Sequence, residues 1–329
     1  MKKTWTLLIV YVFFLAILIG TTFEFPKKDN RFKVMIVSKT VKTEYWRAFN
    51  IGAERALNEL RLDGKVIIAD SGHSITNQAD LLNKLLKQHP DALVIAPTQS
   101  QSIIPILMKY KKKNIPVLLA DTDVEWKDKT SFIGTDNFIL GKKAGALLAS
   151  MLQPGDQVAL IHGTLSDTVS GKRIEGAKES LEEAGIRVVV QRQGYDEFWN
   201  VKPAMESILQ SYPDIKGVFA TDDLLALDAL QVIEQKGLKV PVVGTEGNAK
   251  MVKYIKEGKL SATIAQNPYD MGYISVEQAF KAIKGEKVRK SIDSGTDIIT
   301  RDNAKDKLDL QEKLLRMSEG DVTSFYLRY

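Results

Sequence analysis

Cysteine is absent from the 329 residues of this chain. Its absence excludes disulfides, thiolate metal sites, a cysteine nucleophile and membrane attachment through a lipidated thiol. Histidine is scarce: three occur, none spaced as a metal ligand with another histidine or a carboxylate pair, so we expect no zinc site. The chain also lacks a GxGxxG motif after its first predicted strand, residues 34–37, and has no GxxxxGK[ST] segment. Nucleotide binding therefore has no local support, and we expect no cofactor and no bound metal.

Catalytic side-chain arrangements are equally scarce. The acidic pairs Asp121 with Asp123 and Asp222 with Asp223 could suggest metal or general-acid chemistry. Each pair, however, follows a predicted strand, a position where acidic residues commonly form part of a solvent-exposed turn. We interpret these pairs as solvated turn residues, and we expect a protein that is not an enzyme.

Long hydrophobic runs are missing except at the N-terminus. Lys2 and Lys3 precede an uncharged segment, residues 4–23, which is long enough to cross a hydrocarbon core of ~30 Å. Small residues that would mark a cleavage site are poorly represented after it, although a cut after Gly20 is compatible with the sequence. We expect an uncleaved anchor within residues 1–25, with the rest of the chain outside the cell. The alternative is a cleaved signal and a secreted or periplasmic protein.

Charge of one sign is not concentrated anywhere. The net charge is +5, and the run of lysines at 111–113 is the only tight basic cluster. It lies near the end of a predicted helix, and a solvated helix end explains it. The apolar and charged fractions, 44% and 26%, are those of a globular chain long enough for two core-bearing units.

After a spacer at 26–31, short apolar runs alternate with amphipathic helical patterns. The first unit, residues 33–60, has a buried strand at 34–37 and then Thr43 as N-cap of a helix whose apolar stripe includes Trp46 and Phe49. Glycines follow several predicted helix ends, as at Gly185 and Gly237. Further strands are predicted at 66–69, 92–95, 117–119, 132–134, 158–161, 188–191, 217–220, 240–243, 262–265 and 297–300.

Helices of ten or more residues separate most of these strands, so the connections are crossovers and the sheets are mostly parallel. Eleven strands are too many for one small sheet. The strand–helix rhythm restarts near residues 133–137, where a new apolar helical stripe begins. We therefore predict an α/β chain with two doubly wound parallel-sheet lobes, and a small-molecule site in the cleft between them.

The chain resembles the type I periplasmic sugar-binding proteins, the ribose and galactose group. The motifs that carry the resemblance occur in the family's order over about residues 32–300: VSKTVKTEYWRAFNIGAERA, PDALVIAPTQSQSIIP, NIPVLLADTD, SFIGTDNFILGKKAGALLA, KRIEGAKE, DIKGVFATDDLLALDAL, VPVVGTEGN and GKLSATIAQNPYDMG. The resemblance implies two lobes joined by three hinge crossings, near residues 135–137, 265–267 and 294–297. The N-terminal lobe would comprise 32–134 and 267–294, the C-terminal lobe 135–266 and 295–303. Residues 304–329 form an extension that the family does not need.

The resemblance also implies a set of sugar-binding residues. Aromatic rings would stack on the apolar C–H faces of a sugar, and carboxylates, an arginine and an amide would bond its hydroxyls. The side chains implied by matching motifs are Tyr45, Trp46, Asp121, Arg173, Asp222, Glu246 and Gln266. Less closely matched candidates are Thr43, Thr122, Tyr195 and Trp199.

Three of these positions depart from the pattern of the ribose group. Thr122 stands where an arginine is usual, Asp222 where asparagine is common, and Glu246 where aspartate is usual. The longer acid would reach one methylene further into the cleft, and Arg173 would face several carboxylates. The ligand implied is an aldose or similar polyol, with a pentose as one candidate.

Structural roles compete with ligand contact at several of these residues. Trp46 lies on the apolar stripe of its helix, so core packing is an alternative. Asp121 and Asp222 could cap the helices that follow their strands. Glu246 could lie at the start of a helix, where the helix dipole favours a carboxylate. Gln266 could bridge backbone groups of the hinge.

Three functions follow from this organisation. We favour a sugar receptor that stays anchored and reports lobe closure to a membrane sensor such as a histidine kinase. The alternative is the substrate-binding subunit of an ABC sugar importer, which would work with a permease. A sugar-responsive repressor would need a helix-turn-helix ahead of Phe32, where the hydrophobic segment stands instead, so we expect no nucleic-acid partner.

Overall fold

The computed structural model describes residues 31–40, 43–69, 75–98, 102–124, 126–163, 168–194 and 201–325. The chain divides into two compact units, Met1–Arg31 and Phe32–Tyr329, and both sheets with their helices belong to the second. The expected anchor lies outside the described residues, as do Tyr195 and Trp199. Among the described residues, no helix has both the length and the apolar character that a membrane span requires.

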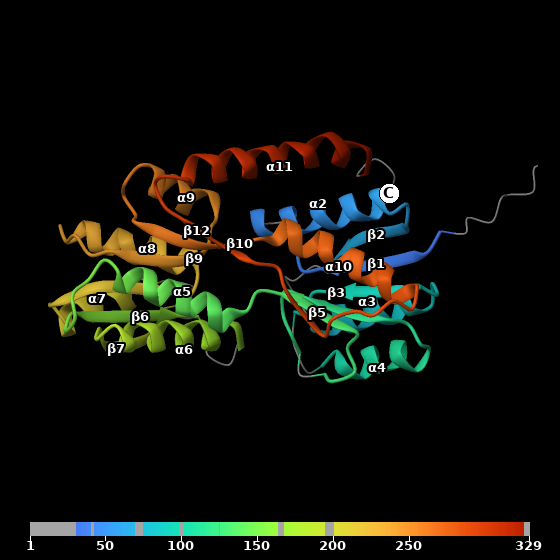
Figure 1. Cartoon of the computed structure of the whole chain (residues 1–329), viewed down its shortest axis with the longest axis horizontal. Coiled ribbons are helices and arrows are strands. Elements are labelled where there is room, and N and C mark those ends of the chain that lie inside the picture. The colour runs from blue at the N-terminus through green and yellow to red at the C-terminus, as the bar shows by residue number, and fades with distance from the viewer. Residues whose placement is uncertain are drawn as a thin grey trace, which may run out of the picture. The chain divides into compact units, whose positions relative to one another are not determined.

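The first sheet has six parallel strands in the order β11-β5-β4-β3-β1-β2 (Figure 1). Helices α2 (Glu44–Glu59) and α10 (Pro268–Ile283) cover one face of this sheet, and α3 (Ile75–Leu86) and α4 (Ile104–Lys112) cover the other. The strands are β1 (Lys33–Ser38), β2 (Asp63–Ile68), β3 (Ala92–Ile95), β4 (Val117–Ala120), β5 (Ser131–Gly134) and β11 (Ser291–Asp293).

The second sheet repeats this plan with one antiparallel edge. Its order is β12-β10-β9-β8-β6-β7, and β12 runs antiparallel to β10. Helices α5 (Asn137–Ala149) and α6 (Thr168–Glu183) pack on one face, and α7 (Lys202–Ser211), α8 (Asp223–Gln235) and α9 (Ala249–Lys256) pack on the other. The strands are β6 (Gln157–His162), β7 (Arg187–Gln193), β8 (Ile215–Ala220), β9 (Val242–Glu246), β10 (Ala262–Gln266) and β12 (Thr296–Ile299).

Strand periodicity explains why helices cover both faces of each sheet. In β1, Val34 and Ile36 pack toward α2 and α10, whereas Met35 and Val37 pack toward α3 and α4. All four are at most 1% exposed. Because successive side chains of a strand point to opposite faces, a strand that is apolar throughout needs cover on both sides. A doubly wound sheet has helices on both faces, so it buries both sides of the strands that these uninterrupted apolar runs form.

The two-lobe α/β architecture predicted from the sequence is confirmed, and each of the eleven predicted strands is present, one with the predicted ends (92–95) and ten with one or both ends shifted. Strand β11 was not predicted, because it has three residues, two of them exposed, and so carries no apolar run. The glycines predicted to end helices adopt positive φ, 74° at Gly185 and 69° at Gly237, the conformation in which glycine is unstrained.

The chain passes between the two sheets three times: from β5 to α5, from β10 to α10, and from β11 to β12. All three passages start at the carboxyl end of a strand. The polar residues at the carboxyl ends of both sheets therefore lie close to these passages, as expected for an α/β ligand site. The residue limits assigned to each lobe from the sequence remain a prediction.

The last helix, α11 (Ala304–Phe325), follows β12 directly. Ala304 is fully buried, and Leu308 packs against the core formed by α7, α8 and α9. In Figure 1, α11 (red) runs past α9 and then along α2, and its backbone contacts both helices. The C-terminal extension, as far as Phe325, is thus a helix that touches both lobes.

Candidate functional site

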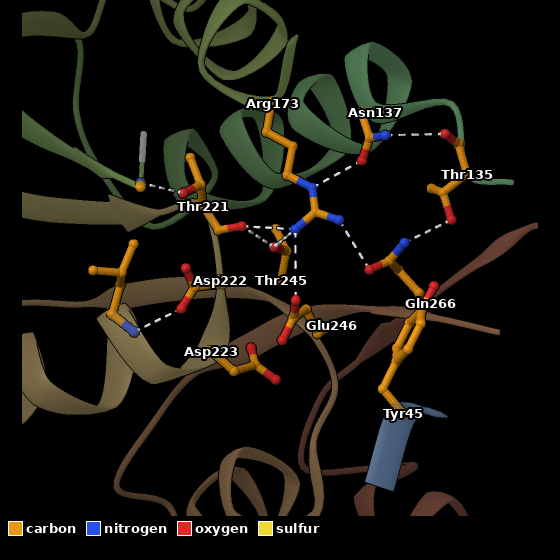
Figure 2. Close-up of polar contacts among 12 residues, drawn as sticks. Tyr45, Thr135, Asn137, Arg173, Thr221, Asp222, Asp223, Thr245, Glu246 and Gln266 are labelled. Atoms are coloured by element: carbon orange, nitrogen blue, oxygen red, sulfur yellow. Dashed lines mark hydrogen bonds and ion pairs between the residues drawn. The ribbon is translucent and has the colours of Figure 1, made fainter. Parts of the chain in front are cut away.

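Arg173, in the second turn of α6, is buried in the second lobe and donates hydrogen bonds to four groups around it (Figure 2). Its Nε donates to Asn137 Oδ1 at 2.9 Å, and its Nη2 donates to Gln266 Oε1 at 2.9 Å. Its Nη1 donates to the carbonyl of Thr221 at 2.7 Å and to Thr245 Oγ1 at 2.9 Å. The guanidinium therefore joins the carboxyl ends of β8, β9 and β10 to the first turn of α5.

Close packing between helices places Arg173. Gly141 of α5 faces the backbone of α6 so closely that a Cβ there would stand 2.2 Å from the Arg173 carbonyl oxygen. Gly145, one turn later, makes a similar approach to Ala177. Glycine at these positions thus determines how near α6 comes to the strand ends.

We expect Gly141→Ala to lower the free energy of unfolding by about 1–2 kcal/mol. Alanine improves helix propensity by about 1 kcal/mol. Overpacking costs typically about 1–3 kcal/mol, and we expect the upper part of that range, about 2–3 kcal/mol, because the atom 2.2 Å away belongs to backbone that cannot move aside. Denaturant unfolding measures this change. Stability equal to or above that of the unmodified chain would contradict the close approach of α5 and α6.

Glu246 ends β9 beside Arg173, with its Oε1 4.0 Å from Arg173 Nη1. Its φ is 110°, a region that residues other than glycine rarely adopt, and such strain is typical of functional loops. Burial, followed by the nearby charge of Asp222, raises the pKa of Glu246 to about 8, while Arg173 acts in the opposite direction. This carboxyl therefore holds a proton at neutral pH and can both donate and accept hydrogen bonds.

The two aspartates at the start of α8 have different roles. Asp222 is the N-cap, and its Oδ1 accepts a hydrogen bond from the Leu225 N–H at 2.8 Å. Asp223 is fully buried and accepts from the Asn248 N–H at 2.7 Å and from Thr263 Oγ1 at 3.0 Å. Interpreting Asp223 as a solvated turn residue was therefore wrong. Burial, and then the charge of Glu246, raises its pKa well above the ordinary value.

Asp121 is the centre of a second polar cluster, at the end of β4 in the first lobe. Its carboxylate accepts hydrogen bonds from the Tyr45 hydroxyl at 2.7 Å, from Lys39 Nζ at 2.7 Å and from the Thr122 hydroxyl at 3.0 Å. Burial alone would raise the pKa of Asp121, but the Lys39 ammonium and these hydrogen bonds hold it below its usual value. Asp121 thus stays ionised and oriented.

Lys39 is a functional candidate that the sequence analysis missed. Besides Asp121, its Nζ donates to Thr122 Oγ1 at 2.7 Å. Lys39 thereby supplies a cation beside Asp121, where the ribose group's arginine is replaced by threonine. Its position directly after β1, at the carboxyl end of an interior strand, was the available signal.

Trp46 and Thr43 are occupied by structural contacts. Trp46 is 8% exposed, and its ring packs edge-on against Tyr45 and Phe49, each at a centroid distance of 5.3 Å. Thr43 is the predicted N-cap and accepts from the Trp46 N–H at 3.4 Å. Core packing of Trp46 is thus observed, and ligand contact by either residue remains a prediction.

Gln266 takes part in the hinge, although it bonds side chains and not the backbone groups that its alternative interpretation proposed. Its Nε2 donates to Thr135 Oγ1 at 2.8 Å while its Oε1 accepts from Arg173, so it connects two of the three passages between lobes. Only 5% of Gln266 is exposed. A ligand that bonds Arg173 or Gln266 would act directly on the hinge.

The clusters of the two lobes face each other. The pKa of Tyr45 is raised well above its usual value, first by burial and then by Asp121, and it also responds to the charges of Glu246 and Arg173. A direct contact lies nearby, where the Glu44 carboxylate of α2 accepts the Ala249 N–H of α9 at 3.1 Å. The structure therefore brings Tyr45, Asp121, Arg173, Glu246 and Gln266 together from both lobes.

The chemistry of this arrangement is that of hydroxyl recognition. Carboxylates on both sides accept hydrogen bonds, and Arg173, Lys39 and the protonated Glu246 donate them. In the part of the chain that the structure describes, no three histidine or acidic side chains come together as a metal-binding group.

The fold and this site define a two-lobed binding protein, and the comparison with family models agrees. The model of the periplasmic binding protein domain matches residues 34–287, and the chain belongs to that family. The resemblance inferred from the sequence is therefore confirmed at the level of the family.

Among individual relatives, the chain is similar to the ribose import binding protein RbsB of Bacillus subtilis. The two are 30% identical over 261 residues, which cover 79% of this chain and 85% of the relative. The D-allose-binding periplasmic protein of Escherichia coli is 26% identical over 77% of this chain and 85% of its own.

Solved structures show the same architecture. A periplasmic solute binding protein of an ABC transporter from Actinobacillus succinogenes, with bound D-allose, superposes with a TM-score of 0.77 at 25% identity, over 84% of this chain and all of that one. GanP, a glucose-galactose binding protein from Geobacillus stearothermophilus, gives a TM-score of 0.75 at 26% identity, over 83% and 98%.

Proposed function

We propose that this protein is an extracytoplasmic sugar-binding receptor that closes its two lobes over an aldose, without chemical conversion of the ligand. The observation that carries the proposal is the pair of facing clusters, Asp121 with Lys39 and Tyr45 in one lobe, and Arg173 with Glu246 in the other. Hydroxyls arranged around a sugar ring are both donors and acceptors, so an aldose can bond both clusters at once.

Closure follows from this bridging. A ligand that binds both lobes favours the closed conformation by its differential affinity for it, and the hinge passages absorb the movement. The network from Arg173 through Gln266 to Thr135 links the proposed ligand contacts to two of these passages. Occupancy of the site would thus alter the surface that a partner meets.

For the partner, we propose the permease of an ABC sugar importer. The relatives named for import of ribose and for binding of allose, glucose and galactose support both this partner and an aldose ligand. A pentose is the first candidate because ribose is named for the relative that is 30% identical.

The second candidate, which the sequence analysis favoured, is input to a sensor histidine kinase. It depends on an uncleaved anchor within residues 4–23 together with the absence of cysteine, which excludes tethering as a lipoprotein. Pull-down of the full chain from membranes, with and without the bound sugar, distinguishes the two: recovery of a permease supports import, and recovery of a kinase supports sensing.

The sugar itself is tested by a thermal-shift screen across pentoses, hexoses and their phosphates. A ligand that binds only the folded state stabilises it by about 2.7 kcal/mol at 100 times its dissociation constant, so at least one aldose should raise the melting temperature. Failure of every sugar would refute the proposed function.

Asp121→Asn tests the site without disturbing the fold. Asp121 has φ of 65°, which asparagine tolerates, so the backbone should be retained. We expect sugar affinity to fall about 10–100-fold, because the charged acceptor is lost and Lys39 has no carboxylate to orient it. Calorimetric titration measures the affinity, and Asp128→Asn, in the loop before β5, is the matched control.

A further inference from the structure

The C-terminal helix is held against the second lobe at a defined position. Lys307 Nζ lies 3.3 Å from Asp297 Oδ2 of β12, and Gln311 Nε2 donates to the Gly247 carbonyl at 2.7 Å. From there α11 continues along α2 of the first lobe (Figure 1). The helix therefore closes one side of the space between the lobes.

A cavity of about 470 Å³ lies under this helix, and we name it the α11 chamber. Its inner wall is formed by Tyr45, Glu246 and Gln266, and its outer wall includes Ala48 of α2 with Leu310 and Leu314 of α11. The volume is within the range of roughly 300–1,000 Å³ that is usual for small-molecule sites.

The α11 chamber adjoins the proposed sugar site without containing it. Neither Arg173 nor Asp121 is among the described residues that line it, whereas Tyr45, Glu246 and Gln266 belong to both spaces. A group attached to a sugar at the facing clusters would pass these shared residues into the chamber.

Groups that can bond hydroxyls also line the chamber. Asp270 supplies a carboxylate acceptor and Lys313 an ammonium donor. The chamber therefore combines an apolar wall with charged groups, a combination that suits the C–H faces and the hydroxyls of a sugar ring.

We propose that the ligand is a glycoside, an aldose bearing a second sugar ring, and that the second ring occupies the α11 chamber. This inference rests on the proposed function and makes its substrate class more specific. The C–H face of the second ring packs on Leu310 and Leu314, and its hydroxyls bond Asp270 and Lys313. The C-terminal extension thereby becomes part of the binding site.

The test compares free and linked sugars on the full chain. Each aldose that stabilises the protein is titrated calorimetrically, alone and in disaccharides that contain it. We expect a disaccharide to bind at least as tightly as the free aldose. Ala48→Trp and Leu314→Trp, which fill the chamber from two different helices, should weaken disaccharide binding at least tenfold and change free-aldose binding less than twofold. Asn58→Trp, exposed near the end of α2, is the control and should change neither.

The outcomes separate this inference from the proposed function. Binding of free aldoses with no binding of any disaccharide overturns the chamber and leaves the proposed function standing. Equal weakening of both ligands in Ala48→Trp and Leu314→Trp also overturns it. Absence of binding by every sugar, free or linked, overturns both. Retained free-aldose binding in the two variants shows in the same experiment that they fold.

Discussion

Replacing Arg173 with alanine is expected to abolish sugar binding and to lower the free energy of unfolding by about 3–5 kcal/mol. The side chain is 4% exposed, and its hydrogen bonds hold groups on four elements. Its removal leaves the Gln266 and Asn137 oxygens without their donor, and it deprives Glu246 of the nearby cation. Such losses are large because the partners stay buried without compensation.

Two further variants show which property of Arg173 matters. Arg173→Lys keeps the charge but cannot present the planar fork, so it should retain part of the stability and little of the binding. Lys172→Ala, exposed one residue earlier on α6, is the control and should change neither. Denaturant unfolding and calorimetric titration measure the two effects. An Arg173→Ala chain as stable as the unmodified protein would show that the buried network does not hold the strand ends together.

The second large effect expected is a pH-dependent loss of stability due to Glu246. Its pKa is about 8 in the folded chain, and the ordinary value is 4.5. Below pH 4.5 both states hold the proton. Between 4.5 and 8 only the folded state holds it, so the free energy of unfolding falls as pH rises through this window. Above 8 both states are ionised and the stabilising contribution is lost.

Glu246→Gln should remove this dependence, because glutamine resembles the protonated acid. The melting temperature of the variant minus that of the unmodified chain should rise between pH 5 and 8 and then stay constant. Since 36% of the Glu246 side chain is exposed, water screens its neighbours and makes the rise smaller than the pKa shift alone would imply. Glu175→Gln, exposed on α6, is the control. A difference that is flat or falls across pH 5–8 would contradict the raised pKa.

The groups that surround Glu246 explain the direction of this effect. Asp222 and Asp121 raise its pKa and Arg173 lowers it, after the larger contribution of burial. Asp223 lies behind it and holds the neighbouring loop through the Asn248 N–H. The departures at Asp222 and Glu246 predicted an acidic pocket, whereas Asp223 was predicted to be a solvated turn residue.

Local patterns were sufficient to predict most of the scaffold. Thr43 was predicted as an N-cap, and capping was the alternative considered for Asp222, because a side-chain oxygen ahead of a helix satisfies free N–H groups; both form those bonds. The apolar run of β1 predicted a strand buried on both faces. Strand β11 could not be predicted, since it is held by pairing with β5 and has too few residues for periodicity.

The candidate site was only partly predictable for a related reason. Asp121, Arg173 and Gln266 were selected by resemblance, and the structure places them at the carboxyl ends of strands or on a helix that faces those ends. Lys39 and Asp223 were missed because their importance comes from partners far away in the sequence, at 121 and 263.

The amino-acid sequence by itself determined the strands, the helices and their caps, and the division into two α/β lobes, because these depend on apolar periodicity and on residues within a few positions of one another. Only the tertiary structure decided which polar side chains meet. Burial and charge at Glu246, the contact of Lys39 with Asp121, and the chamber that Gln311 and α11 complete all arise where distant segments pack together. Packing over such separations leaves no periodic trace in the chain.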